Sequence, residues 1–204
     1  MKNSADVFSK CVFVAGAAEL WQIPGAKGPE VAFVGRSNVG KSSLINAVTS
    51  SRRIARVSRS PGRTQQINFF TMADEISLVD LPGYGYAEVS KGTRKSWDNL
   101  IRSYLAGRQN LMRVFLLIDS RHGVKKNDEE IMELLDRSAV AYQIVLTKTD
   151  KVKDRTYVRE EIATKILAHT AAHPEIIETS AEKMLGIESL REEVRKFIQG
   201  YDFR

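Results

Sequence analysis

The sequence predicts an α/β fold in which one doubly wound, mostly parallel sheet of about six strands is flanked by helices. Three observations lead to this prediction. Short, almost unbroken apolar runs recur along the chain, as is typical of strands buried on both faces. Amphipathic helical patterns separate these runs. Glycine-rich or polar motifs directly follow several of the runs, and in such folds ligands bind beyond the carboxyl ends of the strands.

The predicted strands are the apolar runs themselves. They lie at residues 31–34, 66–70, 76–79, 114–118, 144–146 and 176–177. The second and third of these runs are close in sequence and are expected to pair within the same sheet. A chain of 204 residues is long enough for one sizeable domain with a buried core, whereas two full domains would be cramped.

Helices are predicted where apolar residues recur at intervals of three or four. Such stripes occupy residues 97–105, 158–166 and 187–198, and a shorter one follows the first glycine-rich motif. Asn127 followed by Glu130 resembles a capping box and predicts that a further helix begins there.

Residues 1–28 are interpreted as an N-terminal extension that packs on a domain spanning residues 29–204, with the boundary in a turn-rich segment. The apolar stretch 11–18 is shorter than the roughly 18 residues that a membrane helix needs. The single cysteine, Cys11, suits a reducing compartment. We therefore expect a cytoplasmic monomer that does not engage a membrane.

The segment from Gly35 to Ser42 matches the phosphate-binding pattern G-x-x-x-x-G-K-[ST], with a strand before it and a helix after it. Its backbone N–H groups and the helix N-terminus can bind phosphate oxygens. Lys41 is expected to reach the β- and γ-phosphates, and the Ser42 hydroxyl to ligate Mg²⁺. The pattern alone does not separate ATP from GTP. The nucleotide-binding residues predicted here are Gly35, Arg36, Ser37, Asn38, Val39, Gly40, Lys41, Ser42 and Ser43.

Three later motifs, each after an apolar run, favour guanine. Asp80 would hold Mg²⁺ through a water, and the Gly83 N–H would meet the γ-phosphate. The Asp150 carboxylate can accept the paired N–H donors of guanine, which adenine lacks. A backbone N–H after Thr179 would bind the guanine oxygen. Each motif is weak alone, but their order is specific. The residues predicted to bind nucleotide are Asp80, Leu81, Pro82, Gly83, Thr147, Lys148, Thr149, Asp150, Thr179, Ser180 and Ala181.

With these motifs the chain resembles the EngB (YihA/YsxC) family of TRAFAC-class GTPases, in the TrmE–Era–EngA–EngB–septin group. Residues 35–46, 61–65, 80–87 and 147–150 carry the resemblance. It implies an EngB-type G domain at residues 29–204. It also implies that Thr64 in the first switch completes the Mg²⁺ shell only when GTP is bound. The implied first-switch ligands are Gly62, Arg63, Thr64, Gln65 and Gln66, and the implied catalytic residues are Lys41, Thr64 and Gly83.

The resemblance further implies a molecular switch that hydrolyses GTP, acts in assembly of the large ribosomal subunit and is needed for normal cell division and septation. Ribosomal RNA or the large subunit is the implied partner. The net charge of +6 and an arginine cluster at residues 52–63 also favour RNA. A solvated switch face is the alternative interpretation of this cluster. Positive charge continues at Lys91, Arg94, Lys95, Arg102 and Arg108.

Tyr84 stands directly after D-x-x-G, where many GTPases carry a glutamine that orients water. We therefore expect slow intrinsic hydrolysis, accelerated by a partner or a monovalent cation. By resemblance Asn38 is either a K⁺ ligand or only a stabiliser of its loop. Thr147 replaces the usual asparagine, which predicts modest affinity with guanine specificity retained through Asp150. No catalytic role is predicted for Asp119.

Two other functions stay open. One is a scaffold at the division site, whose protein contacts are controlled by GTP without direct RNA binding. The other is a P-loop ATPase or small-molecule kinase, against which Asp150 argues. Binding that survives ribonuclease and high salt would favour the scaffold, because phosphate contacts weaken steeply with salt.

Overall fold

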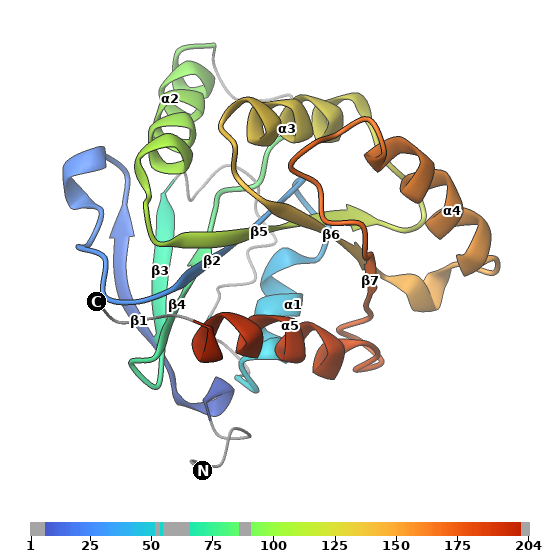
Figure 1. Ribbon diagram of the computed structural model, residues 1–204, viewed down its shortest axis with the longest axis horizontal. Helices are drawn as coiled ribbons and strands as arrows, with labels where there is room; N and C mark the ends of the chain where they lie inside the picture. The colour runs from blue at the N-terminus through green and yellow to red at the C-terminus, as the bar shows by residue number, and fades with distance from the viewer. Residues whose placement is uncertain (1–6, 52–53, 55–65, 86–90, 201–204) are drawn as a thin grey trace.

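The computed structural model describes residues 7–51, 54, 66–85 and 91–200, and for residues 91–98 the backbone alone. A seven-stranded sheet forms its middle layer, in the order β1-β3-β4-β2-β5-β6-β7 (Figure 1). Strands β2, β4, β5, β6 and β7 run parallel, whereas β3 is antiparallel to both β1 and β4. The strands are β1 (Cys11–Ala17), β2 (Glu30–Gly35), β3 (Ile67–Met72), β4 (Ile76–Asp80), β5 (Leu111–Asp119), β6 (Tyr142–Thr147) and β7 (Ile177–Glu178).

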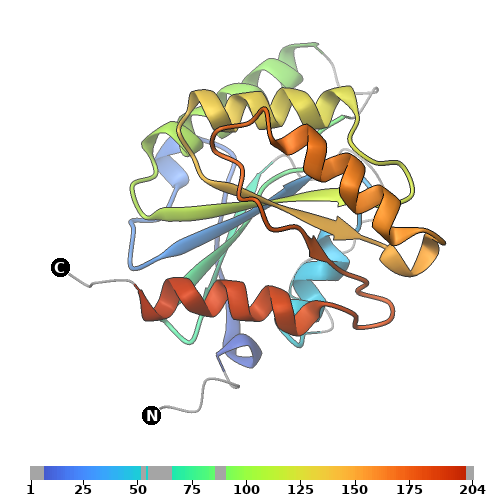
Figure 2. The ribbon, with the colours of Figure 1, turned by 45° about the vertical axis from the view of Figure 1, so that its right-hand side comes forward.

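Helices cover both faces of this sheet, which confirms the predicted doubly wound α/β fold. Figures 1 and 2 show α2, α3 and α4 on one face and α1 and α5 on the other. Their bounds are α1 (Lys41–Val48), α2 (Lys91–Gly107), α3 (Lys126–Arg137), α4 (Arg155–Ile166) and α5 (Ile187–Gln199). None of the helices among the described residues is long and apolar enough to cross a membrane.

The seventh strand, β1, was not predicted. It forms the edge of the sheet from part of the N-terminal segment and pairs with β3, with a bulge between Phe13 and Ala15. Three consecutive side chains from Val12 to Val14 are exposed, so the strand lacks the alternation that marks a half-buried strand in a sequence. Its pairing is decided by the free edge of β3, whose residues lie fifty or more positions further along the chain than their partners.

The start of α3 also differs from the prediction. The helix begins at Lys126, and the Asp128 carboxylate accepts a hydrogen bond of 2.8 Å from the Lys125 N–H. The capping box predicted from Asn127 and Glu130 is therefore wrong. Asp128, one residue past Asn127, thus makes the contact to the residue just before the helix, and its charge also favours the helix N-terminus.

The core has two parts because successive residues of a strand point to opposite faces of the sheet. In β5, Leu116 packs with the α2–α3–α4 layer and Phe115 with the α1–α5 layer. Glu30, fully buried at the start of β2, accepts 2.8 and 2.7 Å bonds from the Arg108 guanidinium, which also donates to the Pro24 carbonyl at 2.8 Å. Arg108, expected to extend a basic surface, is instead bound within the fold.

Candidate nucleotide-binding site

The motifs singled out in the sequence follow β2, β4, β6 and β7 directly, so they gather at the carboxyl edge of the parallel part of the sheet. Gly62, Arg63, Thr64 and Gln65 lie outside the described residues. Gln66 is described: its amide donates to Asn68 at 2.9 Å, and its side chain lies against Gly16 in β1.

The loop after β2 turns tightly into α1. Gly40 precedes the helix at φ 103°, a backbone conformation that residues with a side chain rarely adopt. The Val39 N–H donates to the Arg36 carbonyl at 3.1 Å, and Asn38 also has a positive φ of 65°. These turns lead into the N-terminus of α1, where free N–H groups and the helix dipole favour an anion such as phosphate.

Two opposite charges meet beside this loop. The ammonium group of Lys41 contacts Oδ1 of Asp80 at the end of β4, and the two side chains are only 12% and 10% exposed. Each group therefore neutralises the other in the structure described. An incoming phosphate would compete for Lys41, and a cation for Asp80. The Asp80 carboxylate and the Ser42 hydroxyl, which follows Lys41 in the chain, are oxygen donors of the kind that Mg²⁺ prefers.

The segment after β4 lies directly along the phosphate loop. The Ser37 N–H donates to the Tyr84 carbonyl at 3.0 Å, and the Tyr84 N–H donates to the Gly35 carbonyl at 3.3 Å. A Cβ atom on Gly83 would lie 3.3 Å from the Ser37 nitrogen, which is tighter than most real contacts. The close approach of the two segments therefore favours glycine at position 83.

Tyr84 directs its hydroxyl toward α3. The side chain is 6% exposed and donates a 2.6 Å hydrogen bond to Oδ1 of Asp128, whose Oδ2 lies 3.4 Å from the Arg36 Nε. Burial, reinforced by the Asp128 charge, raises the pKa of Tyr84 well above its usual range. The phenol therefore stays protonated and is held by α3, which leaves it unsuited to orienting an attacking water.

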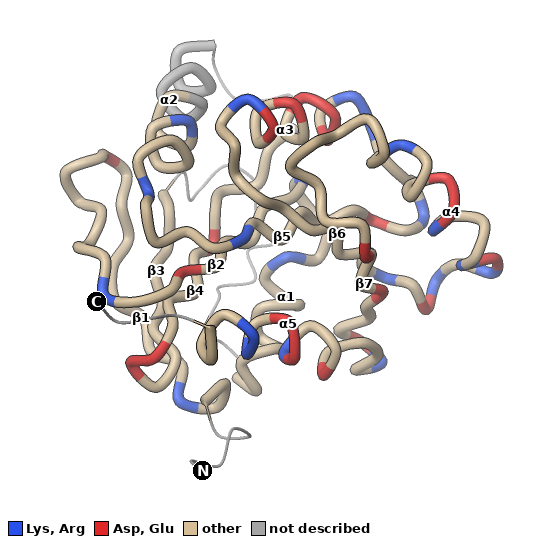
Figure 3. The backbone as a smooth tube through the Cα atoms, in the orientation of Figure 1, with Lys and Arg blue, Asp and Glu red and all other residues tan. Residues whose placement is uncertain are grey.

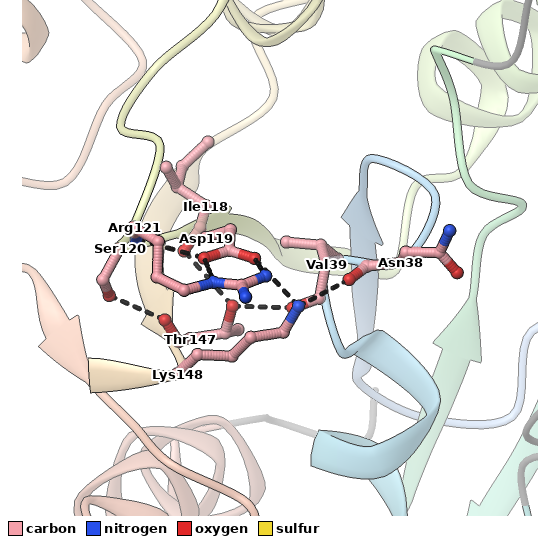
Figure 4. Close-up of polar contacts among 8 residues, drawn as sticks. All are labelled: Asn38, Val39, Ile118, Asp119, Ser120, Arg121, Thr147 and Lys148. Atoms are coloured by element: carbon pink, nitrogen blue, oxygen red, sulfur yellow. Dashed lines mark hydrogen bonds and ion pairs between the residues drawn. The ribbon is translucent and has the colours of Figure 1, made fainter. Parts of the chain in front are cut away.

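At the other end of the loop, the motif after β6 binds the loop backbone (Figure 4). The Thr147 hydroxyl donates to the Val39 carbonyl at 2.7 Å. The Lys148 ammonium donates to the Asn38 carbonyl at 2.7 Å and to Oδ2 of Asp119 at 2.8 Å. Thr147 thus connects two parts of the site, a role that prediction from nucleotide contacts alone did not include.

Asp119, at the end of β5, is the main residue that the sequence prediction missed. Burial alone would raise the pKa of its carboxyl, but hydrogen bonds from Arg121 and Lys148 outweigh burial and hold the pKa well below its usual range. Arg121 contributes its Nε at 2.9 Å and its Nη2 at 2.7 Å. The available signal was a carboxylate at the end of a strand that is parallel to the motif-bearing strands.

The Asp150 carboxylate lies on the short helix η4 (Thr149–Lys151), and its side chain is 8% exposed. A hydrogen bond from Ser180 lowers its pKa, so the group is ionised at neutral pH. Its Oδ2 is buried and accepts no hydrogen bond within the described residues, although the Lys151 ammonium lies 3.2 Å away. Because the Lys151 side chain is 45% exposed, this carboxylate oxygen can still accept hydrogen bonds from a ligand that offers N–H donors.

The last motif, which begins at Thr179, is hydrogen-bonded to the end of β6 and to η4. The Thr149 N–H donates to the Thr179 carbonyl at 3.1 Å, and the Thr179 hydroxyl donates to the Leu146 carbonyl at 2.8 Å. Ser180 lies next in the chain and reaches Asp150. The structure therefore brings the motif at residues 147–150 and the motif that begins at Thr179 together around the Asp150 carboxylate.

The chain has clear relatives. A family model described as 50S ribosome-binding GTPase matches residues 30–148. A probable GTP-binding protein EngB of Cereibacter sphaeroides is 54% identical over 183 residues, which cover 89% of this chain and 84% of the relative. A probable GTP-binding protein EngB of Gluconobacter oxydans is 50% identical over 190 residues, covering 92% and 84%.

Solved structures have the same fold. The crystal structure of a probable GTP-binding protein EngB superposes with a TM-score of 0.69 at 23% identity, covering 83% of this chain and 98% of that one. Era in complex with MgGDPNP and nucleotides 1506–1542 of 16S ribosomal RNA superposes with a TM-score of 0.66 at 24% identity, covering 85% and 57%.

Proposed function

Because the chain belongs to the EngB family of GTP-binding proteins and is a GTPase, we propose that it works as a GTP-controlled switch in large ribosomal subunit assembly. The observation that supports guanine most strongly is the buried Asp150 oxygen that accepts no hydrogen bond within the described residues. Guanine offers adjacent N–H donors to such a carboxylate, and adenine does not. In this proposal Lys148 lies along the base, and a backbone N–H near Ala181 binds the guanine oxygen.

The phosphates occupy the loop from Gly35 to Ser43 in this proposal, with Leu81 and Pro82 placing the Gly83 N–H near the γ-phosphate. Mg²⁺ would be held by Ser42, by Asp80 through a water and, with GTP, by Thr64. When bound, the ion neutralises phosphate charge. The assignment of Thr64 rests on the family resemblance, because residues 62–65 lie outside the described residues. The division into an extension (1–28) and a G domain (29–204) is part of the same proposal.

Hydrolysis is proposed to be slow without help. Lys41 and the Gly83 N–H would stabilise charge on the transferred phosphate, but the Tyr84 hydroxyl is committed to Asp128 at 2.6 Å. A partner or K⁺ near Asn38 would then supply the stabilisation of the transition state that the chain's own residues lack. Single-turnover rates compared in KCl and NaCl test the potassium part, and equal rates would reject it.

Ribosomal RNA is the proposed partner, because the matching family is one of 50S ribosome-binding GTPases and the net charge is +6. Figure 3 shows acidic and basic residues interspersed along α3 and α5. These two helices therefore offer no continuous basic face in this view, and the RNA proposal rests on the arginines of residues 52–63, which lie outside the described residues. A link to cell division and septation is proposed from the family resemblance alone.

Co-sedimentation with purified ribosomal subunits tests the proposal. The full chain is pelleted with large or small subunits in a non-hydrolysable GTP analogue or in GDP, at two salt concentrations. We expect salt-sensitive binding to the large subunit in the GTP state only, since phosphate contacts weaken as salt rises. Absence of pelleting in both nucleotide states would reject the ribosomal role and leave the GTPase assignment in place.

A division-site protein scaffold is the second candidate, and one observation favours it. Large apolar side chains are exposed on β1 and the short helix η3 (Leu20–Gln22), where Trp21 is 82% exposed. Exposed apolar surface of this kind is common at protein-binding sites. Capture of division proteins that survives ribonuclease and high salt, together with failed ribosome binding, would favour this function over ribosome assembly.

A further inference from the structure

We propose that Asp119 and Arg121 position Lys148 for the guanine base and thereby set the affinity for guanine nucleotide. The inference rests on the proposed function, because it assumes that Lys148 contacts the base. Neither residue belongs to the four nucleotide-binding motifs.

The Asp119 carboxylate is oriented by a forked contact with one neighbour. Nε of Arg121 donates to Oδ1 at 2.9 Å and Nη2 donates to Oδ2 at 2.7 Å, while the Arg121 backbone N–H donates to Oδ1 at 3.1 Å. A guanidinium held by two parallel bonds fixes the plane of a carboxylate, which a single ammonium group cannot do. The turn that follows the strand keeps Arg121 in place, because Gly123 donates to the Asp119 carbonyl at 3.1 Å.

This orientation aims Oδ2 at Lys148. The ammonium group donates to two oxygens that are themselves held in place, Oδ2 of Asp119 at 2.8 Å and the Asn38 carbonyl at 2.7 Å. Asp119 is almost fully buried, with 5% of its side chain exposed, whereas Lys148 is 28% exposed. Figure 4 shows the Arg121 and Lys148 side chains converging on this carboxylate from the segments that follow β5 and β6. The lysine is thereby fixed at its charged end, while its stem passes Gly40.

The backbone of Lys148 is also held in an unusual conformation. Its φ of 57° is left-handed, a conformation that a lysine adopts only where its surroundings require it. The Ser120 hydroxyl donates to the Thr147 carbonyl at 2.6 Å, directly before that strained residue. Ser120 thus holds the backbone directly before Lys148, while Asp119 and the Asn38 carbonyl hold its ammonium group.

A side chain that is already ordered loses less entropy when the ligand arrives, so binding becomes tighter without any new ligand contact. Asp119 and Arg121 are therefore positioning residues that act through Lys148. Asp150 would still select guanine if they were changed. The rate of hydrolysis at saturating GTP would also stay the same, because neither residue touches the transferred phosphate.

A double-mutant cycle tests this role. Affinity and dissociation rate are measured with fluorescent GDP on the full chain as wild type, Asp119→Asn, Lys148→Met and the double variant. We expect Asp119→Asn to weaken GDP binding about tenfold, mostly through faster dissociation, as befits a charged hydrogen bond. In the Lys148→Met background the same change should alter affinity less than about twofold. Equal losses in both backgrounds would overturn the inference.

Arg121 provides an independent arm if Asp119→Asn folds poorly. Arg121→Lys keeps the charge but not the fork, so it should weaken GDP binding nearly as much as Arg121→Gln; full affinity in Arg121→Lys would also overturn the inference. The matched control is Arg137→Gln, which removes an exposed pair with Glu133 on α3. Failure of wild type to bind GDP would reject the proposed function and this inference together, whereas tight wild-type binding with unchanged Asp119→Asn would reject the inference alone.

Discussion

The two ends of the proposed nucleotide site, called here the base end and the phosphate end, are built in different ways. At the base end, Thr147 and Lys148 already hold backbone oxygens of the phosphate loop at 2.7 Å, and Asp119 is bound by Arg121. At the phosphate end, Lys41 and Asp80 are bound to each other. Nucleotide and Mg²⁺ would have to take over those two side chains, whereas they would find the base end already formed.

The difference teaches that recognition and switching need opposite designs. Selection of one base depends on fixed donors and acceptors, since a mobile site could adapt to the wrong base. A switch instead needs contacts that exchange when a phosphate leaves. Hydrogen bonds from Thr147 and Lys148 to Val39 and Asn38 connect the two ends, so the fixed half supports the half that exchanges partners.

The largest expected effect lies at the fixed end. Asp150→Asn replaces a carboxylate acceptor by an amide that can donate, and xanthine carries an oxygen where guanine carries its amine. We expect the preference for GDP over XDP to change by at least about a hundredfold, in favour of XDP. Competition between the two nucleotides for the full chain measures it, and an unchanged preference would refute the role of Asp150.

At the exchanging end, Lys41→Met should weaken GTP binding by about fifty- to a hundredfold, because charged hydrogen bonds to phosphate are lost. The nucleotide-free protein should also lose stability, because Lys41→Met leaves the nearly buried Asp80 carboxylate without its partner. Calorimetric binding and chemical unfolding measure the two quantities. An affinity equal to that of wild type would show that Lys41 does not reach the phosphates.

The contact between the segment after β4 and α3 sharpens the comparison further. Tyr84→Phe removes the donor to the buried Asp128 and should lower the free energy of unfolding by about 1–3 kcal/mol. GDP affinity should change less than about twofold, because the hydroxyl faces α3. The matched control is Tyr157→Phe, whose side chain is 64% exposed and should change stability little. Equal stability losses in both variants would contradict the assigned contact.

The smallest effect is a pH dependence at the base end. The folded protein holds the pKa of Asp119 below the unfolded value of about 3.9, so the folded state binds fewer protons in acid. This contribution to stability is present above about pH 4 and is lost as the pH falls toward the folded pKa. Urea unfolding between about pH 5 and pH 3 should show a shallower loss in Asp119→Asn than in wild type. Identical slopes would argue against an ionised Asp119 held by Arg121 and Lys148.

The sequence alone determined the strand–helix alternation and the loop from Gly35 to Ser43. It also determined which motifs follow which strands. These features are local: an apolar run, a glycine turn and a helix start lie within a few residues of one another. Asp150 could be singled out in the same way, because its chemistry toward guanine depends on the residue type and on the preceding strand.

Only the tertiary structure decided which distant residues meet. Tyr84 reaches Asp128 across 44 positions, and Lys148 reaches Asp119 across 29. The edge strand β1 likewise exists because β3 offers it free hydrogen-bonding groups. Such contacts depend on which strands become neighbours in the sheet, and that order follows from burying the helices on both faces of the sheet rather than from any local pattern.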